Sequence, residues 1–275
     1  MEHTGNNIQG RPRAACRRAQ LPAMRCCAIQ AQAVIPGTTM SHHSAGSDRP
    51  AGPDKWDAIV RHYETCLRRY GATPGGADWP NGADLAARFG VMLTLLRGAA
   101  DRPSLLDLGC GPALLVDYLA VTGCLDHVTY QGIDLSPSMI DTARARWPQY
   151  EFSCRDILES PLPEQSVDIV IMNGVLTERV LLSVETMTAL AEALIKAAFR
   201  SARVGIAFNV MNAHVDWQRE DLFHWSFDAL AAFLKREVTH HYGFRADYGL
   251  YEYTCFAWRQ PQRAEPPKAQ NWWIR

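Results

Sequence analysis

The sequence has almost no net charge and lacks any long hydrophobic run. Its 275 residues carry 28 Lys and Arg against 29 Asp and Glu, so the formal net charge is −1. Because a membrane-spanning helix needs about 18 or more consecutive apolar residues, we expect no membrane partner. Five arginines lie within residues 1–47 beside a single acidic residue, which leaves the remainder of the chain acidic. An acidic remainder disfavours binding to a polyanion, so we expect no nucleic-acid partner either.

Paired cysteine and histidine motifs are also missing. None of the eight cysteines forms a C-x-x-C pair, and the nine histidines show no H-E-x-x-H or similar spacing. Cysteines placed singly in apolar segments are typical of free thiols in a reducing compartment, so we expect a cytoplasmic protein without a disulfide framework. Zinc sites normally show their ligand spacing in the sequence, and we therefore expect no bound metal.

The composition divides the chain into four parts. Residues 1–47 mix Arg, Ala, Gln, Cys and Gly without any periodicity, which indicates a disordered N-terminal extension; the same composition is also typical of transit peptides. Residues 48–102 contain two amphipathic helical patterns and are predicted to form an N-terminal helical cap. Residues 103–260 alternate between strand and helix patterns, and residues 261–275 are predicted to be a C-terminal tail.

The order of the predicted elements indicates an α/β fold. Apolar periodicity and capping residues predict helices over 56–70, 84–97, 113–121, 137–147, 184–200 and 226–235. Short apolar runs predict strands over 105–108, 128–133, 151–154, 167–172, 203–210, 238–242 and 251–258. Strands that alternate with helices form parallel sheets, whereas the short link between the last two strands requires an antiparallel pair at the edge.

The most informative motif lies where the first predicted strand ends. Asp107 is followed by Gly109 and Gly111, and a predicted helix begins directly afterwards. Glycines allow unusual backbone angles and let a ligand lie against the main chain, while the free N–H groups of the new helix favour an anionic group. Taken alone, the two glycines would also fit an ordinary turn between a strand and a helix.

Polar side chains follow the next three predicted strands at corresponding positions. Asp134 ends the second strand, where a carboxylate can accept both hydroxyls of a ribose; its alternative role is to cap the following helix. Asp156 follows the third strand, where it could accept from an adenine amino group, and Asn173 follows the fourth. Open α/β sheets bind ligands at the carboxyl ends of their strands, so we expect these side chains to form one site.

These motifs resemble those of class I S-adenosylmethionine-dependent methyltransferases. The resemblance rests on Asp107–Gly111, Gly132–Ile140, Arg155–Ile157 and Asp168–Gly174, and it covers about residues 100–260. It implies a Rossmann-like sheet of seven strands, mostly parallel with an antiparallel last strand. It also implies S-adenosyl-L-methionine as the cofactor.

The resemblance further implies how the cofactor is bound. The backbone at Gly109 and Gly111 would approach its methionine part, and Asp107 would orient this loop. The carboxylate of Asp134 would take the ribose. The remaining implied contacts are Leu135 and Ile157 around the adenine, Asp156 at its amino group, and Asn173 after the fourth strand. The usual third glycine of the loop is replaced by Ala113, and Pro112 occupies a plausible first helical position.

The N-terminal cap resembles a bacterial branch of the same enzymes whose substrates are poorly defined. In that branch Arg88 would pair with the carboxylate of the cofactor, and the alternative is a solvated residue on a helix. Tyr63 and Trp79 would line the pocket or, as aromatics at helical spacing mostly do, pack in the core.

The predicted activity is methyl transfer to a small-molecule or glycan-precursor acceptor by in-line displacement. Glu178 and His214 are candidate general bases, although the sequence favours a surface or capping role for each of them. Strand four lacks the Asn-Pro-Pro-aromatic and Pro-Cys motifs of DNA methyltransferases. The alternatives are a non-catalytic methyltransferase-like binding subunit and a nicotinamide-dependent oxidoreductase, because Asp134 and the two glycines would also suit a dinucleotide.

Overall fold

The computed structural model describes residues 56–97, 99 and 101–262. The predicted extension over 1–47 and residues 263–275 of the predicted tail lie outside these residues. The helices are α1 (Asp57–Tyr70), α2 (Gly82–Met92), α3 (Leu114–Val121), α4 (Pro137–Arg146), α5 (Val184–Ser201) and α6 (Phe227–Glu237), with 3-10 helices η2 (Pro74–Ala77), η3 (Leu93–Leu96) and η4 (Leu125–His127). The strands are β1 (Ser104–Leu108), β2 (Thr129–Asp134), β3 (Glu151–Cys154), β4 (Val167–Met172), β5 (Ala202–Asn212), β6 (His224–Trp225), β7 (Tyr242–Arg245) and β8 (Glu252–Trp258).

Side-chain caps determine where several helices begin. Ser136 accepts a hydrogen bond from the backbone N–H of Met139, and Pro137 occupies the first helical position of α4, as the sequence predicts. Ser183 and Ser226 cap α5 and α6 in the same way, and Asn81 caps α2. These caps satisfy N–H groups that a helix start would otherwise leave without a partner.

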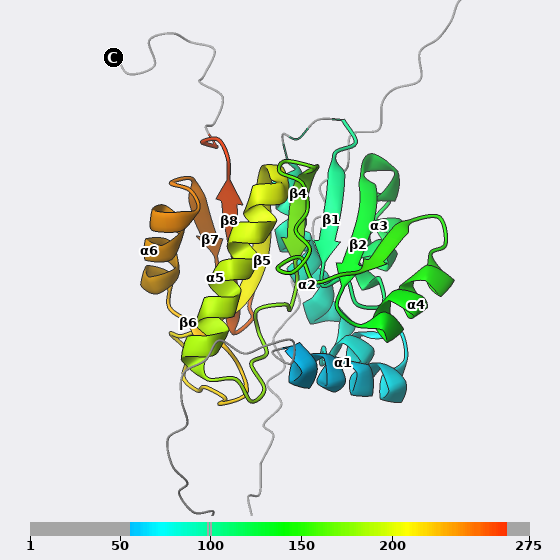
Figure 1. Cartoon of the computed structure of the whole chain (residues 1–275), viewed down its shortest axis with the longest axis horizontal. Coiled ribbons are helices and arrows are strands. Elements are labelled where there is room, and N and C mark those ends of the chain that lie inside the picture. Colours follow the sequence, from blue (N-terminus) through cyan, green and yellow to red (C-terminus); the bar gives the residue numbers. More distant parts are fainter. Residues whose placement is uncertain (1–55, 98, 100, 263–275) are drawn as a thin grey trace, which may run out of the picture. The chain divides into compact units, whose positions relative to one another are not determined.

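One mixed sheet contains all eight strands. Its order is β3-β2-β1-β4-β5-β8-β7, and β6 pairs with the end of β5. The pairs from β3 to β5 are parallel, whereas β8 is antiparallel to both β5 and β7. The carboxyl ends of β1 to β5 therefore meet at one edge of the sheet. Figure 1 shows α1 lying at this edge.

Alternate strand residues divide the core between the two faces of the sheet. Leu106 and Leu108 of β1 pack with α5 and α6, whereas Leu105 packs with α2, α3 and α4 on the opposite face. Figure 1 shows α5 in front of the sheet, with α2 and α3 behind it. Burial on both faces explains why the central strands are continuous apolar runs in the sequence.

The structure confirms the predicted α/β class and corrects three details. The sheet has eight strands instead of seven, because the two-residue β6 is too short to show a pattern. The strand predicted over 238–242 lies at Tyr242–Arg245, since Val238 still ends α6. Helix α3 begins at Leu114, so Pro112 belongs to the preceding turn and is not its first helical residue.

Three of the described cysteines lie in different surroundings. Cys110 and Cys255 are free thiols inside the core, and Cys154 is a free thiol on the surface. Among the described residues, none of the helices is long and apolar enough to cross a bilayer.

Candidate functional site

A pocket lies at the edge of the sheet where the parallel strands end. Its empty volume is about 1070 Å³, including the solvent at its mouth. Residues from the ends of β1, β2, β3 and β4 form its floor, and α1 supplies the opposite wall with Trp56, Ile59, Val60 and Tyr63. Eight of the nine predicted cofactor-binding residues lie in its lining: Asp107, Gly109, Gly111, Asp134, Leu135, Asp156, Ile157 and Asn173. The fold therefore brings these eight residues together in one pocket.

The loop after β1 requires glycine for two different reasons. Gly109 and Gly111 have φ angles of +78° and +52°, in the left-handed region that side chains disfavour. A Cβ atom at Gly109 would also lie 2.4 Å from Cγ2 of Val175. Ala113, which replaces the usual third glycine, has a φ of +64°, so its methyl group costs roughly 1–2 kcal/mol there.

Replacing Gly109 with alanine is expected to destabilise the protein much more than the same change at Gly123. Both glycines have left-handed φ angles, +78° and +70°, but a Cβ at Gly123 meets nothing within 4 Å. Gly123→Ala should therefore lower the free energy of unfolding by about 1 kcal/mol through the backbone alone. Gly109→Ala adds a clash with the stiff Val175 side chain and should lose about 1–3 kcal/mol more. Urea unfolding of both variants measures the difference, and equal losses would contradict the close approach.

The carboxylate of Asp134 connects the end of β2 to the glycine loop. Its Oδ2 accepts from the backbone N–H of Gly111 at 2.8 Å, and its Oδ1 accepts from that of Ser136 at 2.9 Å. Burial raises the pKa of Asp134, and these backbone hydrogen bonds oppose the rise. Because the Ser136 hydroxyl caps α4, the carboxylate is not required as the side-chain cap.

Asp107 lies deeper, under the same loop. It is buried, and the Tyr130 hydroxyl donates a hydrogen bond of 2.8 Å to its Oδ2. Burial raises the pKa of Asp107 to about 7, and the Tyr130 bond only partly offsets the effect of burial. The side chain therefore joins β1 to β2 below the loop that it is predicted to orient.

Asp156 attaches the beginning of α1 to the end of β3. Its Oδ2 accepts from the indole Nε1–H of Trp56 at 3.0 Å, and its Oδ1 accepts from the backbone N–H of Leu158 at 2.8 Å. Further along α1, Glu64 accepts from the hydroxyls of Ser136 and Ser138, each at 2.8 Å. These contacts hold α1 against the mouth of the pocket as a cap.

An acceptor atom without a hydrogen-bond partner in the described part of the chain lies directly after β4. Among the described residues, Asn173 Oδ1 is buried with no hydrogen-bond donor in reach. Gly174 follows with a φ of +79°, and a Cβ there would lie 2.6 Å from the Trp79 ring. An unsatisfied buried acceptor is costly unless a ligand or water donates to it. Asn173 is therefore available to a bound molecule.

Arg88 is not a solvated residue, so that alternative is wrong. The side chain is buried, and its Nε donates to Oε1 of Glu252 at 2.8 Å. Its guanidinium also lies over the Trp79 ring, 4.0 Å from the ring centre. Arg88 does not itself line the pocket, although Trp79 and Tyr63 do. The predicted pairing of Arg88 with a cofactor carboxylate stays a prediction.

The two candidate general bases have different surroundings. Burial and the charges of Asp78 and Asp221 raise the pKa of Glu178 to about 7. Burial and then the charge of Glu178 raise the pKa of Tyr63, which lines the pocket. His214 is exposed after β5 and stacks on Phe227 with ring centroids 5.9 Å apart. The surroundings favour Glu178 over His214.

The sequence offers Tyr63 of α1 as a candidate pocket residue, but it does not indicate that Trp56, Ile59 and Val60 also line the pocket. Helical spacing predicts that these residues lie on one helix, but it does not predict what the helix covers. The residues are Trp56, Ile59, Val60 and Tyr63. Trp56 and Tyr63, the two aromatic residues among them, are the signal in the sequence that could have indicated a pocket wall, since aromatic rings are common in the lining of ligand sites.

Several known proteins that are similar to this chain are methyltransferases by name. A family model described as a methyltransferase domain matches residues 105–197. The Mycobacterium tuberculosis protein Rv1506c, a methyltransferase by name, is 33% identical over 162 residues, which cover 57% of this chain and 93% of that protein. Trans-aconitate 2-methyltransferase of Enterobacter sp. (strain 638) is 36% identical over 105 residues, or 36% of this chain and 40% of that enzyme.

The fold is also found among solved structures. Magnesium protoporphyrin IX methyltransferase from Synechocystis PCC 6803, solved with bound SAM, has a TM-score of 0.50 at 18% sequence identity. The match covers 78% of this chain and 100% of that chain. At this level of identity the likeness shows the shared architecture.

Proposed function

Since this chain belongs to the class I S-adenosylmethionine-dependent methyltransferases, we propose that it methylates a small-molecule or glycan-precursor acceptor. S-adenosyl-L-methionine is the cofactor of this family. The observation that carries the proposal is Asp134, whose carboxylate is held by two backbone N–H groups in the wall of a pocket at the strand ends.

The residues of the pocket fit this cofactor. Asp134 offers remaining lone pairs to ribose hydroxyls, and the apolar side chains of Leu135 and Ile157 offer walls to an adenine. Asn173 Oδ1, buried and without a donor among the described residues, suits an N–H group of the ligand. Gly109 and Gly111 line the pocket and, having no side chains, let a ligand lie against the main chain. Asp156 keeps acceptor capacity beside its bonds from Trp56 and Leu158.

When bound, S-adenosyl-L-methionine supplies an electrophilic methyl group on its sulfonium. The task of the chain is therefore to hold an acceptor atom in line with that group and to exclude water, and orientation of this kind can lower a barrier by several kcal/mol. Trp56 and Tyr63 on the cap α1 are placed to exclude water from the pocket. A pocket covered by one helix and walled largely by apolar side chains suits a small acceptor.

Of the two candidate general bases, we propose Glu178 for an acceptor with a weakly acidic proton. Glu178 does not line the pocket, but its charge acts on Tyr63, which does. A pKa of about 7 allows a carboxylate to take up a proton near neutral pH. The similarity to trans-aconitate 2-methyltransferase, whose name specifies a small organic acid, supports a small-molecule acceptor.

Calorimetric titration followed by a transfer assay tests the proposed function. We expect the purified chain to bind S-adenosylmethionine and not NAD. We then expect a deuterated methyl group from the cofactor to appear, by mass spectrometry, in a component of a metabolite extract. With that acceptor in hand, Glu178→Gln should lower kcat with little change in KM.

Other outcomes select the alternatives. Tight binding of NAD without S-adenosylmethionine would identify a nicotinamide-dependent enzyme. Cofactor binding without labelled product across extracts of small molecules and glycan precursors would identify a binding subunit. An unchanged kcat in Glu178→Gln would remove this residue from the mechanism while leaving the activity intact.

A further inference from the structure

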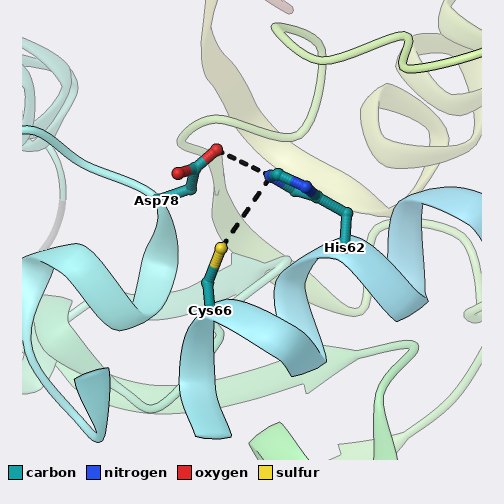
Figure 2. Close-up of side chains that lie close together, drawn as sticks. All are labelled: His62, Cys66 and Asp78. Carbon is teal, nitrogen blue, oxygen red and sulfur yellow. Dashed lines mark hydrogen bonds and ion pairs between the residues drawn. The ribbon is translucent and has the colours of Figure 1, made fainter. Parts of the chain in front are cut away.

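Three side chains with different donor atoms converge beside the cap. His62 Nε2 lies 2.7 Å from Asp78 Oδ2 and 3.9 Å from Cys66 Sγ, and the three atoms all lie within 4.8 Å of one another. Figure 2 shows all three side chains pointing toward the same small volume. We propose that His62, Cys66 and Asp78 form a binding site for Zn²⁺, with a fourth coordination position open to water.

The backbone alone brings these residues together. His62 and Cys66 lie four positions apart on α1, so they share one face of the helix. The chain then folds back so tightly that a Cβ at Gly76 would lie 1.8 Å from the carbonyl oxygen of Gly71. The segment that folds back ends at Asp78, which has a left-handed φ of +58°. The convergence is therefore built into the path of the backbone.

The arrangement is that of a ligand set and not that of a proton relay. In a relay, the imidazole uses one nitrogen for the nucleophile and the other for the carboxylate. Here the Cys66 thiol and the Asp78 carboxylate both face the same nitrogen, Nε2 of His62. Convergence on one point is what coordination of a single ion requires.

The donor set and the distances select the metal. One imidazole nitrogen, one thiolate and one carboxylate suit Zn²⁺, whereas Mg²⁺ and Ca²⁺ prefer oxygen donors alone. Tetrahedral coordination with bonds of about 2.0–2.3 Å separates neighbouring ligand atoms by roughly 3.4–3.6 Å. His62 Nε2 lies 2.7 Å from Asp78 Oδ2 and 3.9 Å from Cys66 Sγ, on either side of that range. Changes of less than about 1 Å in these two distances would accommodate an ion.

The site is accessible, and its neighbours line the pocket. The His62 and Asp78 side chains are 35% and 40% exposed, so an ion can enter from solvent. Tyr63 follows His62 in the chain, and Ala77 and Trp79 flank Asp78; all three line the pocket. A bound ion would therefore fix the turn after η2 to α1 and hold the wall of the pocket in place. This role is positional and goes beyond the proposed methyl transfer.

The sequence predicts no bound metal, because its cysteines and histidines form no paired ligand motifs. An H-x-x-x-C pair on one helix, completed by an aspartate twelve positions after the cysteine, has no recognised spacing. Asp78 can be recognised as the third ligand once the fold of residues 71–78 is known.

Metal titration of the full-length chain tests the proposal without using the methyl-transfer reaction. After removal of metal by a chelator, we expect wild type to bind Zn²⁺ and to show a rise in melting temperature on doing so. With Co²⁺ as a spectroscopic substitute, we expect a sulfur-to-metal charge-transfer band and the visible bands of tetrahedral coordination. Cys66→Ala should lose the charge-transfer band. Asp78→Asn, whose asparagine tolerates the left-handed φ, should weaken Zn²⁺ binding about tenfold or more.

Cys154→Ala is the matched control, because Cys154 is an exposed thiol on another element. It should keep the charge-transfer band and the Zn²⁺-dependent rise in melting temperature. A band that persists unchanged in Cys66→Ala would assign the metal to other cysteines and overturn the proposal, as would wild type without any thiolate band. Binding of S-adenosylmethionine by the chelator-treated variants checks that they are folded, and it separates a failure of this site from a failure of the proposed function.

Discussion

Asp134→Ala is expected to reduce the affinity for S-adenosylmethionine by about 100-fold or more. The carboxylate lies in the pocket wall, and its position is fixed by the N–H groups of Gly111 and Ser136. Hydrogen bonds to a charged group contribute roughly 1.5–3 kcal/mol each, so the loss of two ribose contacts reaches this magnitude. Isothermal titration calorimetry measures the change directly.

Two further variants make the result interpretable. Asp134→Asn keeps the volume and one carbonyl oxygen, so its affinity should fall between those of wild type and Asp134→Ala. Asp228→Asn removes an exposed carboxylate in the first turn of α6 and should bind as wild type does. If Asp134→Ala remains folded and binds within threefold of wild type, the carboxylate does not hold the ribose.

Arg88→Met is expected to lower the free energy of unfolding by about 3–5 kcal/mol. The variant leaves Glu252, which is 1% exposed, as a buried carboxylate without its cation. The double variant Arg88→Met/Glu252→Gln removes both charges and should recover much of the loss. Arg61→Met breaks an exposed pair with Asp57 and should change stability by less than about 1 kcal/mol. Chemical denaturation of the four proteins measures these differences.

The same variants test the predicted role of Arg88 in binding. Burial raises the pKa of Glu252, and the Arg88 charge opposes that rise, so the pair is best removed together. If Arg88 pairs with the cofactor carboxylate, the stable double variant should still bind S-adenosylmethionine more weakly than wild type. Wild-type affinity in the double variant would limit Arg88 to a structural role. If the double variant is as unstable as Arg88→Met, the loss of stability does not come from leaving the Glu252 carboxylate without its cation.

Local patterns were sufficient to predict the parts of the fold that local physics determines. The apolar run Leu105–Leu108, the capping Ser136 and the acid at Asp134 each occur beside the element that they specify. Parallel strands place their ends at one edge, so residues distant in the sequence could be assigned to one site. Eight of the nine predicted cofactor residues line the pocket for this reason.

Contacts between distant segments could not be predicted in the same way. The Trp56–Asp156 bond joins residues 100 positions apart, and the Arg88–Glu252 pair joins residues 164 positions apart. Neither partner has a neighbour in the sequence that indicates the other. The single H-x-x-x-C spacing on α1 likewise does not predict a metal site, because the turn at Gly76 brings the third ligand to it. The two-residue β6 was missed because it is shorter than any periodicity.

The insertion of β8 between β5 and β7 has a consequence for how the protein is made. Glu252 is the first residue of β8, and it neutralises an arginine on a helix near the start of the described chain. While the polypeptide emerges from the ribosome, Arg88 must therefore stay hydrated until nearly all of the domain has been synthesised. Packing of α2 onto the sheet is then expected to wait for β8, so this face of the core should be completed only when that strand is available and not progressively from α2 onward.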